Sequence, residues 1–413
     1  MGAVRDLAER LWTGEASTAE HNPLTTFLGL EELGDGLAFV SSFANVVALD
    51  SGDGLVLVDT SSFLTAQAVK HAVAEWRDAP VHTVIYTHGH VDHVMGISAF
   101  ESGGHRARVV SHEAVPARFD RYRRTPGYNA SINARQFRMP GLRWPTEYRY
   151  PDETYATELD LAVGGERLSL RHARGETDDH TWVWLPDRRV LCTGDLFIWA
   201  SPNCGNPQKV QRYPIEWAEA LRAMASLDAE TLLPGHGLPI EGAARVKQAL
   251  LETAELLTVL HDGTVALMNE GRPLDAILGA VKAPEHLLAR PYLRPVYDEP
   301  EFVVRNTWRL YGGWWDGNPA HLKPAREDRL SAEIAQLSGG AARLAERAQA
   351  LSAAGEHALA CHLAEWAGRA SPDDEAIRAI RAAVYRERAA AEPSLMARGV
   401  YTTAADTQVG DGE

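Results

Sequence analysis

The chain has 413 residues, of which 41 are Lys or Arg and 56 are Asp or Glu, so its formal net charge is −15. This length allows two or three domains with full hydrophobic cores. The negative charge argues against nucleic acid or an anionic membrane surface as the main partner, and an anionic substrate would need positive charge supplied locally by metal ions or arginines.

The cysteines and the N-terminus indicate a cytoplasmic protein. Cys192, Cys204 and Cys361 are widely spaced and form no C-x-x-C pair, so neither a disulfide framework nor a cysteine zinc site is expected. The first ten residues are charged and amphipathic and lack the apolar core of a signal peptide. No apolar run reaches the roughly 18 residues that a membrane span requires. We therefore expect a soluble protein in a reducing compartment.

The N-terminal part of the chain predicts strands between two helices. Asp59, at the end of the third of these strands, is a candidate N-cap for the helix that follows. The turn D-S-G-D-G joins the last two strands as a hairpin. The expected elements are a short helix with an irregular lead-in at 1–30, strands at 37–40, 45–49 and 55–59, and a helix at 63–77.

Residues 87–93, T-H-G-H-V-D-H, place three imidazoles and one carboxylate directly after a strand predicted at 81–86. His88 and His90 are two residues apart, so in an extended loop their side chains point the same way. Asp92 and His93 follow at the next bend, where they can face a second ion. A polar surface loop is the competing interpretation, because the chain contains 16 His. The ordered pattern at a strand-to-helix junction favours a metal site.

Residues 112–155 follow a helix expected at 92–101 and a short strand expected at 108–111, and they are rich in Arg, Tyr, Asn and Pro. In a net acidic protein, this density of guanidinium and amide groups indicates an anion-binding insert near the metal site. A solvated loop or helix face explains it equally well. With the basic segment 206–212, this region supplies the candidate substrate-binding residues Asn129, Arg135, Lys209 and Arg212.

Three later motifs supply further candidate ligands, and each lies at the end of a predicted strand, where a rigid element holds a ligand in place. They are R-G-E-T-D-D-H at 174–180, V-L-C-T-G-D at 190–195 and T-L-L-P-G-H-G at 231–237.

In this order the motifs resemble those of the metallo-β-lactamase superfamily, whose signature is the His-x-His-x-Asp-His loop. The resemblance implies an α/β fold, namely an αββα sandwich with a dinuclear, usually zinc, centre between the edges of two sheets. It also implies that Asp195 bridges the two metals and that Asp59 supports the ligand loop. The implied ligands are His88, His90 and Glu176 for one ion, Asp92, His93 and His236 for the other, and Asp195 for both.

Glu176 departs from the superfamily pattern, which commonly has Pro-Gly-His-Thr at this place. The ligand is then Glu176, His172 four residues earlier, or His180 four residues later. Register with the W-L-P end of the following strand favours Glu176, and a divalent metal accepts a carboxylate readily. His172 and His180 would then support the site or face the substrate.

Beyond residue 240 the sequence predicts helices rich in Ala, Leu and Glu. The segment Y-G-G-W-W-D-G-N-P-A at 311–320 resembles the signature of the alkyl sulfatase dimerisation domain, and alkyl sulfatases also have glutamate at the place of Glu176. Two features depart from that family: Asp195 stands where those enzymes have Glu, and no room is left for their C-terminal sterol-carrier-like domain. The expected helices span 242–270, 273–281, 299–312, 325–353, 356–370 and 373–392.

We therefore expect a metal-dependent hydrolase that uses a metal-activated hydroxide, first of all on sulfate esters. Asp92 and Asp195 take catalytic as well as ligand roles. Hydrolysis of a lactone, thioester or β-lactam is the alternative, and a non-catalytic, metal-stabilised dimeric scaffold is the second alternative. The expected cofactor is two Zn²⁺ per chain, with Mn²⁺ or Fe²⁺ possible, and the expected substrate is a small anion.

The predicted domain order follows from these motifs. A homodimer is expected through the helical region around Trp308, Trp314 and Trp315, because an apolar appendage without site chemistry needs a structural purpose. The expected domains are a catalytic domain at 1–240, a helical domain of the alkyl sulfatase dimerisation type at 241–392 and a disordered tail at 393–413.

Overall fold

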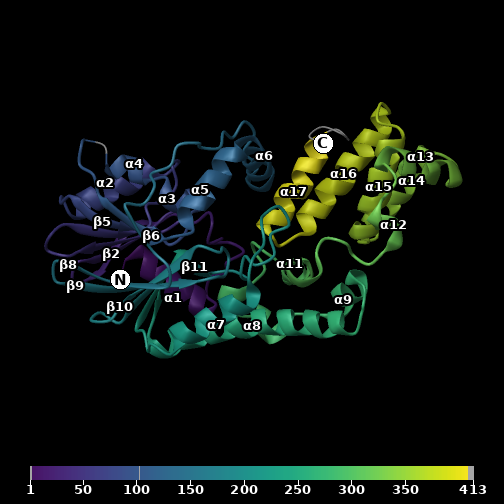
Figure 1. Ribbon diagram of the computed structural model, residues 1–413. Coiled ribbons are helices and arrows are strands. Elements are labelled where there is room, and N and C mark those ends of the chain that lie inside the picture. The colour runs from purple at the N-terminus through teal and green to yellow at the C-terminus, as the bar shows by residue number, and fades with distance from the viewer. Residues whose placement is uncertain (1, 102, 408–413) are drawn as a thin grey trace. The chain divides into compact units, whose positions relative to one another are not determined.

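The computed structural model describes residues 2–101 and 103–407, and these residues form two compact units (Figure 1). The first unit comprises Met1–Pro126 and Pro145–Trp314, and the second comprises Gly127–Trp144 and Trp315–Glu413. The first unit contains both β-sheets, and the second is helical. The predicted fold class, a mixed α/β sandwich followed by a helical region, is thus confirmed.

Two sheets form the centre of the first unit. The larger has seven strands in the order β1-β2-β3-β4-β5-β6-β7, and the smaller has six in the order β13-β12-β11-β10-β9-β8. Strands β1 to β7 are Gly29–Gly34, Leu37–Ser41, Val46–Asp50, Leu55–Val58, Val81–Ile85, Arg108–His112 and Glu153–Tyr155. Strands β8 to β13 are Glu158–Val163, Glu166–Ala173, His180–Leu185, Val190–Ile198, Thr231–His236 and Ile240–Glu241.

Side-chain alternation along the strands explains the layers. In β2, Phe39 packs in the core between the sheets, whereas Ala38 and Val40 face a second core that the helices α2, α4 and α5 cover. Trp217 of α7 and Leu250 of α8 cover the smaller sheet. The helices of this unit are α1 (Ala3–Thr13), α2 (Ala66–Trp76), α3 (Val91–Val94), α4 (Ile97–Phe100), α5 (Val115–Arg124), α7 (Pro214–Ala225), α8 (Ala243–Asn269), α9 (Leu274–Ala280), α10 (Glu285–Leu288) and α11 (Pro300–Gly312), with a 3₁₀ turn, η1 (Pro291–Leu293).

The second unit consists of packed helices, namely α6 and the helices that follow the aromatic segment at 311–315. Ala345 of α14, Ala367 of α15 and Ile377 of α16 form one of its small cores. Its helices are α6 (Pro126–Phe137), α12 (Pro319–Leu322), α13 (Glu327–Leu337), α14 (Ala341–Ala353), α15 (His357–Ala370), α16 (Glu375–Ala391) and α17 (Leu395–Asp406). No helix in the described part of the chain combines the length and apolarity that crossing a bilayer requires.

The structure departs from the sequence predictions in three segments. The insert at 112–155, for which the sequence predicted no regular element, contains α5 and α6. The helix expected at 325–353 is two helices, because Gly339 and Gly340 adopt φ values of 85° and 115°, which end α13. The predicted disordered tail was wrong for 395–406, which form α17. Gly399 of α17 packs so closely on α6 that a Cβ there would lie 2.1 Å from the Gln136 carbonyl oxygen, whereas residues 408–413 lie outside the described range.

The division of the chain also differs from the predicted boundary at residue 240. Helices α8, α9 and α11 belong to the same compact unit as the sheets. Leu250 and Leu257 of α8 share one hydrophobic core with Trp217 and Leu221 of α7. The helices up to Trp314 are therefore part of the sandwich unit rather than of a separate helical domain.

Candidate metal centre

The ligand loop lies between the end of β5 at Ile85 and the start of α3 at Val91. A buried carboxylate, Asp59, holds its first residue. The backbone N–H of Thr87 donates to Asp59 Oδ1 at 2.8 Å, and the Thr87 hydroxyl donates to Oδ2 at 2.7 Å. Asp59 adopts a φ of 62°, in the left-handed region, and is 2% exposed. Asp59, which was predicted to support the ligand loop, therefore contacts the first residue of that loop directly.

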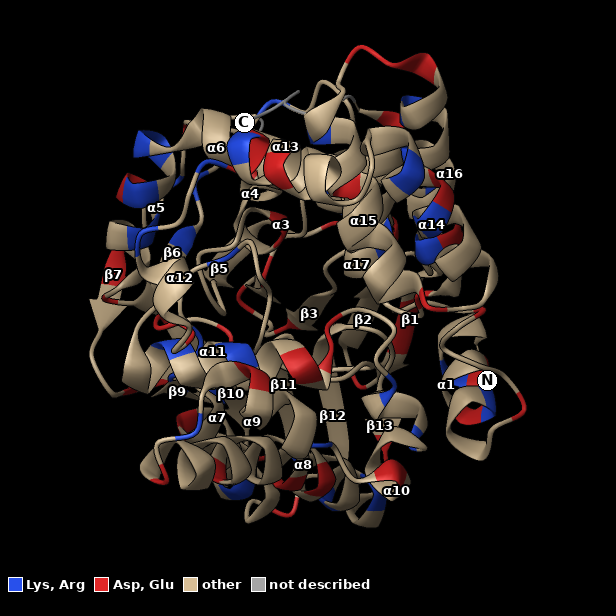
Figure 2. Cartoon of the chain, turned by 90° about the vertical axis from the view of Figure 1, so that its right-hand side faces the viewer, with Lys and Arg blue, Asp and Glu red and all other residues tan. Residues whose placement is uncertain are grey.

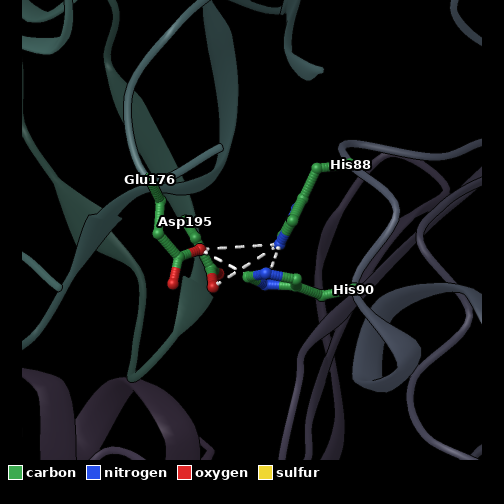
Figure 3. A group of neighbouring side chains, drawn as sticks. All are labelled: His88, His90, Glu176 and Asp195. Atoms are coloured by element: carbon green, nitrogen blue, oxygen red, sulfur yellow. Dashed lines mark hydrogen bonds and ion pairs between the residues drawn. The ribbon is translucent and has the colours of Figure 1, made fainter. Parts of the chain in front are cut away.

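Four predicted ligands converge in a first group, which consists of His88, His90, Glu176 and Asp195 (Figure 3). His88 Nε2 lies 2.8 Å from His90 Nδ1 and 3.6 Å from Glu176 Oε2. His90 Nδ1 lies 3.5 Å from the same Glu176 oxygen. Asp195 Oδ2 lies 3.9 Å from His88 Nε2. Donor atoms at this spacing surround a volume of the size that one metal ion needs.

The other three predicted ligands form a second group, Asp92, His93 and His236. Asp92 Oδ2 lies 3.6 Å from His93 Nε2 and 3.5 Å from His236 Nε2. Asp195 also faces this group, because its Oδ1 lies 3.4 Å from His93 Nε2 and its Oδ2 lies 3.4 Å from His236 Nε2. Its carboxylate is therefore located between the two groups, where a bridging ligand would have to lie.

The backbone near Asp195 brings its side chain into the interior. The pairing of β11 with β12 is irregular on both sides of Gly194, which adopts a φ of 50°. The Asp195 N–H donates to His180 Nε2 at 3.1 Å. On the next strand, Gly235 leaves room for the carboxylate, because a Cβ there would lie 2.1 Å from Asp195 Oδ1. Gly194 and Gly235 are thus both required for this carboxylate to face the groups.

Hydrogen bonds fix the imidazoles with Nε2 toward the interior. His93 Nδ1 lies 2.7 Å from Asp59 Oδ2, and His236 Nδ1 bonds to the carbonyl oxygen of Phe43. His88 Nδ1 lies 2.9 Å from the Thr87 hydroxyl, whose own hydrogen goes to Asp59. In each case Nδ1 is occupied by this contact, so that Nε2 is the ring nitrogen directed at the ligand groups.

Three side-chain nitrogen or oxygen atoms that face the ligand groups lack a hydrogen-bond partner among the described residues. These are His93 Nε2, Glu176 Oε2 and Asp195 Oδ1, all buried. Buried polar atoms are normally paired, so three such atoms in one interior need an explanation. Metal ions supply it, because imidazole nitrogens and carboxylate oxygens are the ligands that Zn²⁺, Mn²⁺ and Fe²⁺ accept. The residues present therefore fit two divalent ions.

The pKa values of the same groups follow from burial and mutual charge. Burial raises the pKa of Glu176 to about 8, against the pull of the Arg212 guanidinium. His93 and His236 hold the pKa of Asp195 well below its usual value although burial opposes them. Burial holds the pKa of His88 and His90 well below the usual value, so both imidazoles are neutral. Two neutral imidazoles and an ionised bridging carboxylate are the forms that bind metal.

The structure separates the three candidates for the departing ligand. His172 does not face the groups, because its Nδ1 bonds to the His180 carbonyl oxygen at 2.9 Å and its ring stacks on His112 at 3.6 Å. His180 lies parallel to the His88 ring at 4.6 Å, and its Nε2 already accepts from Asp195 N–H. Glu176 alone of the three directs a free oxygen at His88 and His90.

Arg212, predicted as a substrate residue, has a different contact. Its Nη1 donates to Glu176 Oε1 at 2.5 Å, and Asn203 Nδ2 donates to the same oxygen. Arg212 is 2% exposed. It therefore orients Glu176 so that Oε2 faces the histidines, a role that the sequence did not indicate because Asn203 and Arg212 are far from Glu176 along the chain.

The remaining predicted substrate residues fall into two places. Lys209 is half-buried beside the ligand groups, and burial, together with the Arg212 charge, lowers its pKa to about 8 although Asp92 and Glu176 oppose this. The charge of Arg121, in the basic last turn of α5, also lowers the pKa of Lys209. Figure 2 shows the Lys and Arg positions along α5 in blue. Asn129 and Arg135 lie on α6 in the second compact unit, and their role stays a prediction.

Two segments of the chain are similar to known protein families. Residues 41–236 match the metallo-β-lactamase superfamily, and residues 274–410 match the alkyl sulfatase dimerisation family. A linear primary-alkylsulfatase of a Pseudomonas species is 27% identical over 386 residues, which cover 86% of this chain and 72% of the relative. An (R)-specific secondary-alkylsulfatase, also from Pseudomonas, is 25% identical over 395 residues, which cover 88% of this chain and 59% of the relative.

A solved structure shows the same fold. The stereoselective inverting sec-alkylsulfatase Pisa1 from a Pseudomonas species superposes with a TM-score of 0.83 at 23% identity, over 91% of this chain and 65% of that chain. The present chain therefore spans less than two thirds of the secondary-alkylsulfatase and of the solved relative.

Fold, site and relatives together define a hydrolase of the metallo-β-lactamase fold. More particularly, the sandwich segment at 41–236 is similar to the metallo-β-lactamase superfamily, and the segment at 274–410 is similar to the alkyl sulfatase dimerisation family.

The stability of the metal-free protein should fall as the pH rises. Burial opposes a raised value, but the Asp195 and Asp92 carboxylates raise the pKa of His236 to about 10, whereas an unfolded histidine titrates near about 6.5. The stabilisation is fully present below about pH 6.5 and is lost as the pH rises toward 10, with a slope of up to about 1.4 kcal/mol per pH unit. Urea denaturation of chelator-treated protein between these pH values measures it.

A matched pair of variants isolates the contribution of His236. His236→Gln should make the decline shallower, whereas His71→Gln, at a histidine whose side chain is 75% exposed, should leave it unchanged. A wild-type unfolding free energy that is flat over this range would contradict the prediction.

Proposed function

We propose that the protein is a dinuclear metal-dependent hydrolase of sulfate esters. The observation that carries the proposal is the half-buried Lys209, which lies within electrostatic reach of Glu176 in the first ligand group and of Asp92 in the second. A cation beside two metal-ligand groups, in a chain with a net charge of −15, marks a place for an anionic group. The alkylsulfatases among the relatives point to a sulfate ester as that group.

In this proposal the seven predicted ligands hold two divalent ions, with zinc as the first expectation. Such ions would lower the pKa of a water molecule from about 15.7 toward neutrality and so supply a nucleophile at physiological pH. The proposed ligands are His88, His90, Glu176 and Asp195 for the first ion and Asp92, His93, His236 and Asp195 for the second.

The chain's own residues prepare the site for this chemistry. Arg212 and Asn203 hold Glu176 by one oxygen, so that the other faces the interior. Lys209 and Arg121 offer charge-assisted hydrogen bonds to the sulfate oxygens. Asp92 in the second group and Asp195 between the groups would complete the negative charge that two divalent ions need. No side chain has to act as a nucleophile.

The departing ligand provides a test of the metal proposal. Glu176→Gln removes a charged oxygen from the first group, so we expect the zinc content to fall from about two ions per chain to about one, or the affinity of one ion to fall about 10- to 100-fold. His172→Ala should keep both ions, because His172 faces away from the groups. Metal analysis after dialysis against zinc-containing buffer measures this.

The opposite pattern, with zinc lost in His172→Ala and retained in Glu176→Gln, would reverse the assignment. Wild-type protein that retains no metal would exclude the metal proposal as a whole.

A substrate panel tests the reaction. Zinc-loaded protein should hydrolyse alkyl sulfates in preference to lactones, thioesters and a chromogenic β-lactam. Lys209→Met should lower kcat/KM for the sulfate by about 10- to 150-fold, which corresponds to about 1.5–3 kcal/mol for a hydrogen bond to a charged group, with zinc content unchanged. Lys247→Met, at an exposed lysine on α8, is the matched control and should have no effect.

Equal rates on sulfates in both lysine variants would contradict the role of Lys209. Hydrolysis of the neutral esters or the lactam alone would favour the alternative hydrolase, and zinc binding without any hydrolysis would favour the scaffold.

We also propose a homodimer, as the dimerisation family match indicates. Large apolar side chains are exposed in the matched region: Leu337 of α13 is 88% exposed, Leu359 of α15 is 55% exposed and Trp314 is 71% exposed. Large apolar side chains that are this exposed are typical of residues that another chain covers. We expect the mass of a dimer by light scattering at micromolar concentration.

Substitutions distinguish this surface from other exposed apolar groups. Leu337→Ser and Trp314→Ser should weaken the dimer, whereas Leu64→Ser, at a leucine 62% exposed in the loop before α2, should leave it unchanged. A monomeric mass for the unsubstituted chain would contradict the proposal.

A further inference from the structure

The loop between the two histidines of the first ligand group is held by a carboxylate outside that group. The backbone N–H of Gly89 donates to Asp179 Oδ2 at 3.1 Å. Asp179 comes three residues after Glu176 and directly before β10, and its side chain is fully buried. One carboxylate therefore connects the segment that carries His88 and His90 to the segment that carries Glu176.

An arginine from a third segment holds this carboxylate in turn. Arg118 of α5 donates from Nε to the same Asp179 oxygen at 2.6 Å and from Nη2 to Asp178 Oδ1. Arg118 is 3% exposed. The loop lies directly on this pair, because a Cβ added to Gly89 would come within 2.8 Å of Arg118 Cδ and 3.0 Å of Asp179 Oδ2.

The Arg118–Asp179 pair does not use all of its hydrogen-bonding atoms, whereas an ion pair that served only stability would use them all. Arg118 Nη1 and Asp179 Oδ1 have no hydrogen-bond partner among the described residues, although both are buried. A buried ion pair with unmet hydrogen bonds contributes little net stability compared with apolar side chains of similar volume. The specific effect of the Arg118–Asp179 pair is to fix the position of Gly89.

The rest of the site does not depend on this contact. Thr87, at the start of the loop, is held by Asp59 and by the Thr181 N–H, which donates to the Thr87 carbonyl oxygen at 2.6 Å. In the second group, His93 is held by Asp59 and His236 by the Phe43 carbonyl oxygen. Loss of the Asp179 contact should therefore disturb His90 and the first group only.

We propose that Arg118 and Asp179 are positioning residues that set the geometry of the first metal group through the Gly89 N–H. The proposal rests on the dinuclear site put forward above. In this proposal, the pair determines how far His90 lies from His88 and Glu176. It thereby determines the affinity of the first group for its metal ion. Neither residue needs to touch metal or substrate.

Asp179→Ala removes the acceptor and tests the proposal with zinc as the probe. Zinc affinity, measured by competition with a chromophoric chelator, should fall about 10- to 100-fold at one of the two sites and stay unchanged at the other. Asp179→Asn should restore wild-type affinity to within a few-fold, because one amide oxygen can accept both from Gly89 N–H and from Arg118 Nε. The Asn rescue separates position from charge.

Glu166→Gln is the matched control. Glu166 and Arg188 form a similar bidentate pair at 2.9 and 2.5 Å, at the opposite end of the β9–β10 strand pair from Glu176, and both zinc sites should keep their affinity in this variant. Melting of each variant in chelator verifies that it is folded. If Asp179→Ala does not fold, Arg118→Lys replaces it, because lysine keeps the charge but cannot donate from a fork, and it should again weaken one site.

Three results would overturn the proposal: two unchanged sites in the folded Asp179→Ala or Arg118→Lys protein, equal weakening of both sites, or no rescue by Asp179→Asn. Wild-type protein that binds fewer than two zinc ions would instead show that the dinuclear proposal itself had failed.

Discussion

The structure of the site depends on one buried carboxylate, that of Asp195. A carboxylate that is 5% exposed is costly to ionise unless cations or hydrogen-bond donors surround it. Two imidazoles, His93 and His236, supply that charge in the metal-free protein, and the pKa of His236 is raised to about 10 as a result. In the proposed dinuclear site, metal ions would take over the same task. The backbone irregularity at Gly194 and the missing side chain at Gly235 exist to let this carboxylate reach the interior.

Few cations are buried around this centre in the acidic chain, and their contacts differ. Arg212 pairs with Glu176, and Arg118 pairs with Asp179, so both guanidinium groups hold carboxylates at or next to the first ligand group. Lys209 is different, because its pKa is lowered to about 8 by burial and by its cationic neighbours. A cation that its surroundings destabilise gains most from an anionic ligand. The two arginines therefore build the site, whereas Lys209 is the cation that we propose for binding the substrate anion.

The sequence predicted the site better than its surroundings, for physical reasons. The ligand residues His88, His90, Asp92 and His93 are close together along the chain, and the order of the later motifs resembles that of the superfamily, which implied the seven side chains that the two groups contain. The contacts of Arg212 and Arg118 join segments 36 and 61 residues apart. No local pattern distinguishes such a buried arginine from a solvated one, so the basic segments were interpreted as substrate-binding.

Helices were predicted well where their apolar periodicity was strong. They were predicted poorly where tertiary packing determined whether a segment was helical. Helix α17 was interpreted as disordered because its residues are small and polar, yet small residues such as Gly399 are what allow it to contact α6 closely. The ends of α13 and α14 depended on two glycines inside an otherwise helical pattern. In both cases tertiary contact or backbone conformation, rather than composition, determined the outcome.

The helices from Ala243 to Trp314 have a further consequence, for how such proteins exchange parts during evolution. The match to the dimerisation family begins at residue 274, inside the compact unit that contains the sheets. A recombination event at the end of the β-lactamase-like segment would separate α8 from Trp217 and Leu221 of α7 and expose the apolar surface that these helices share. A sandwich transferred in this way would need α8, or another apolar helix in its place, to cover that surface again.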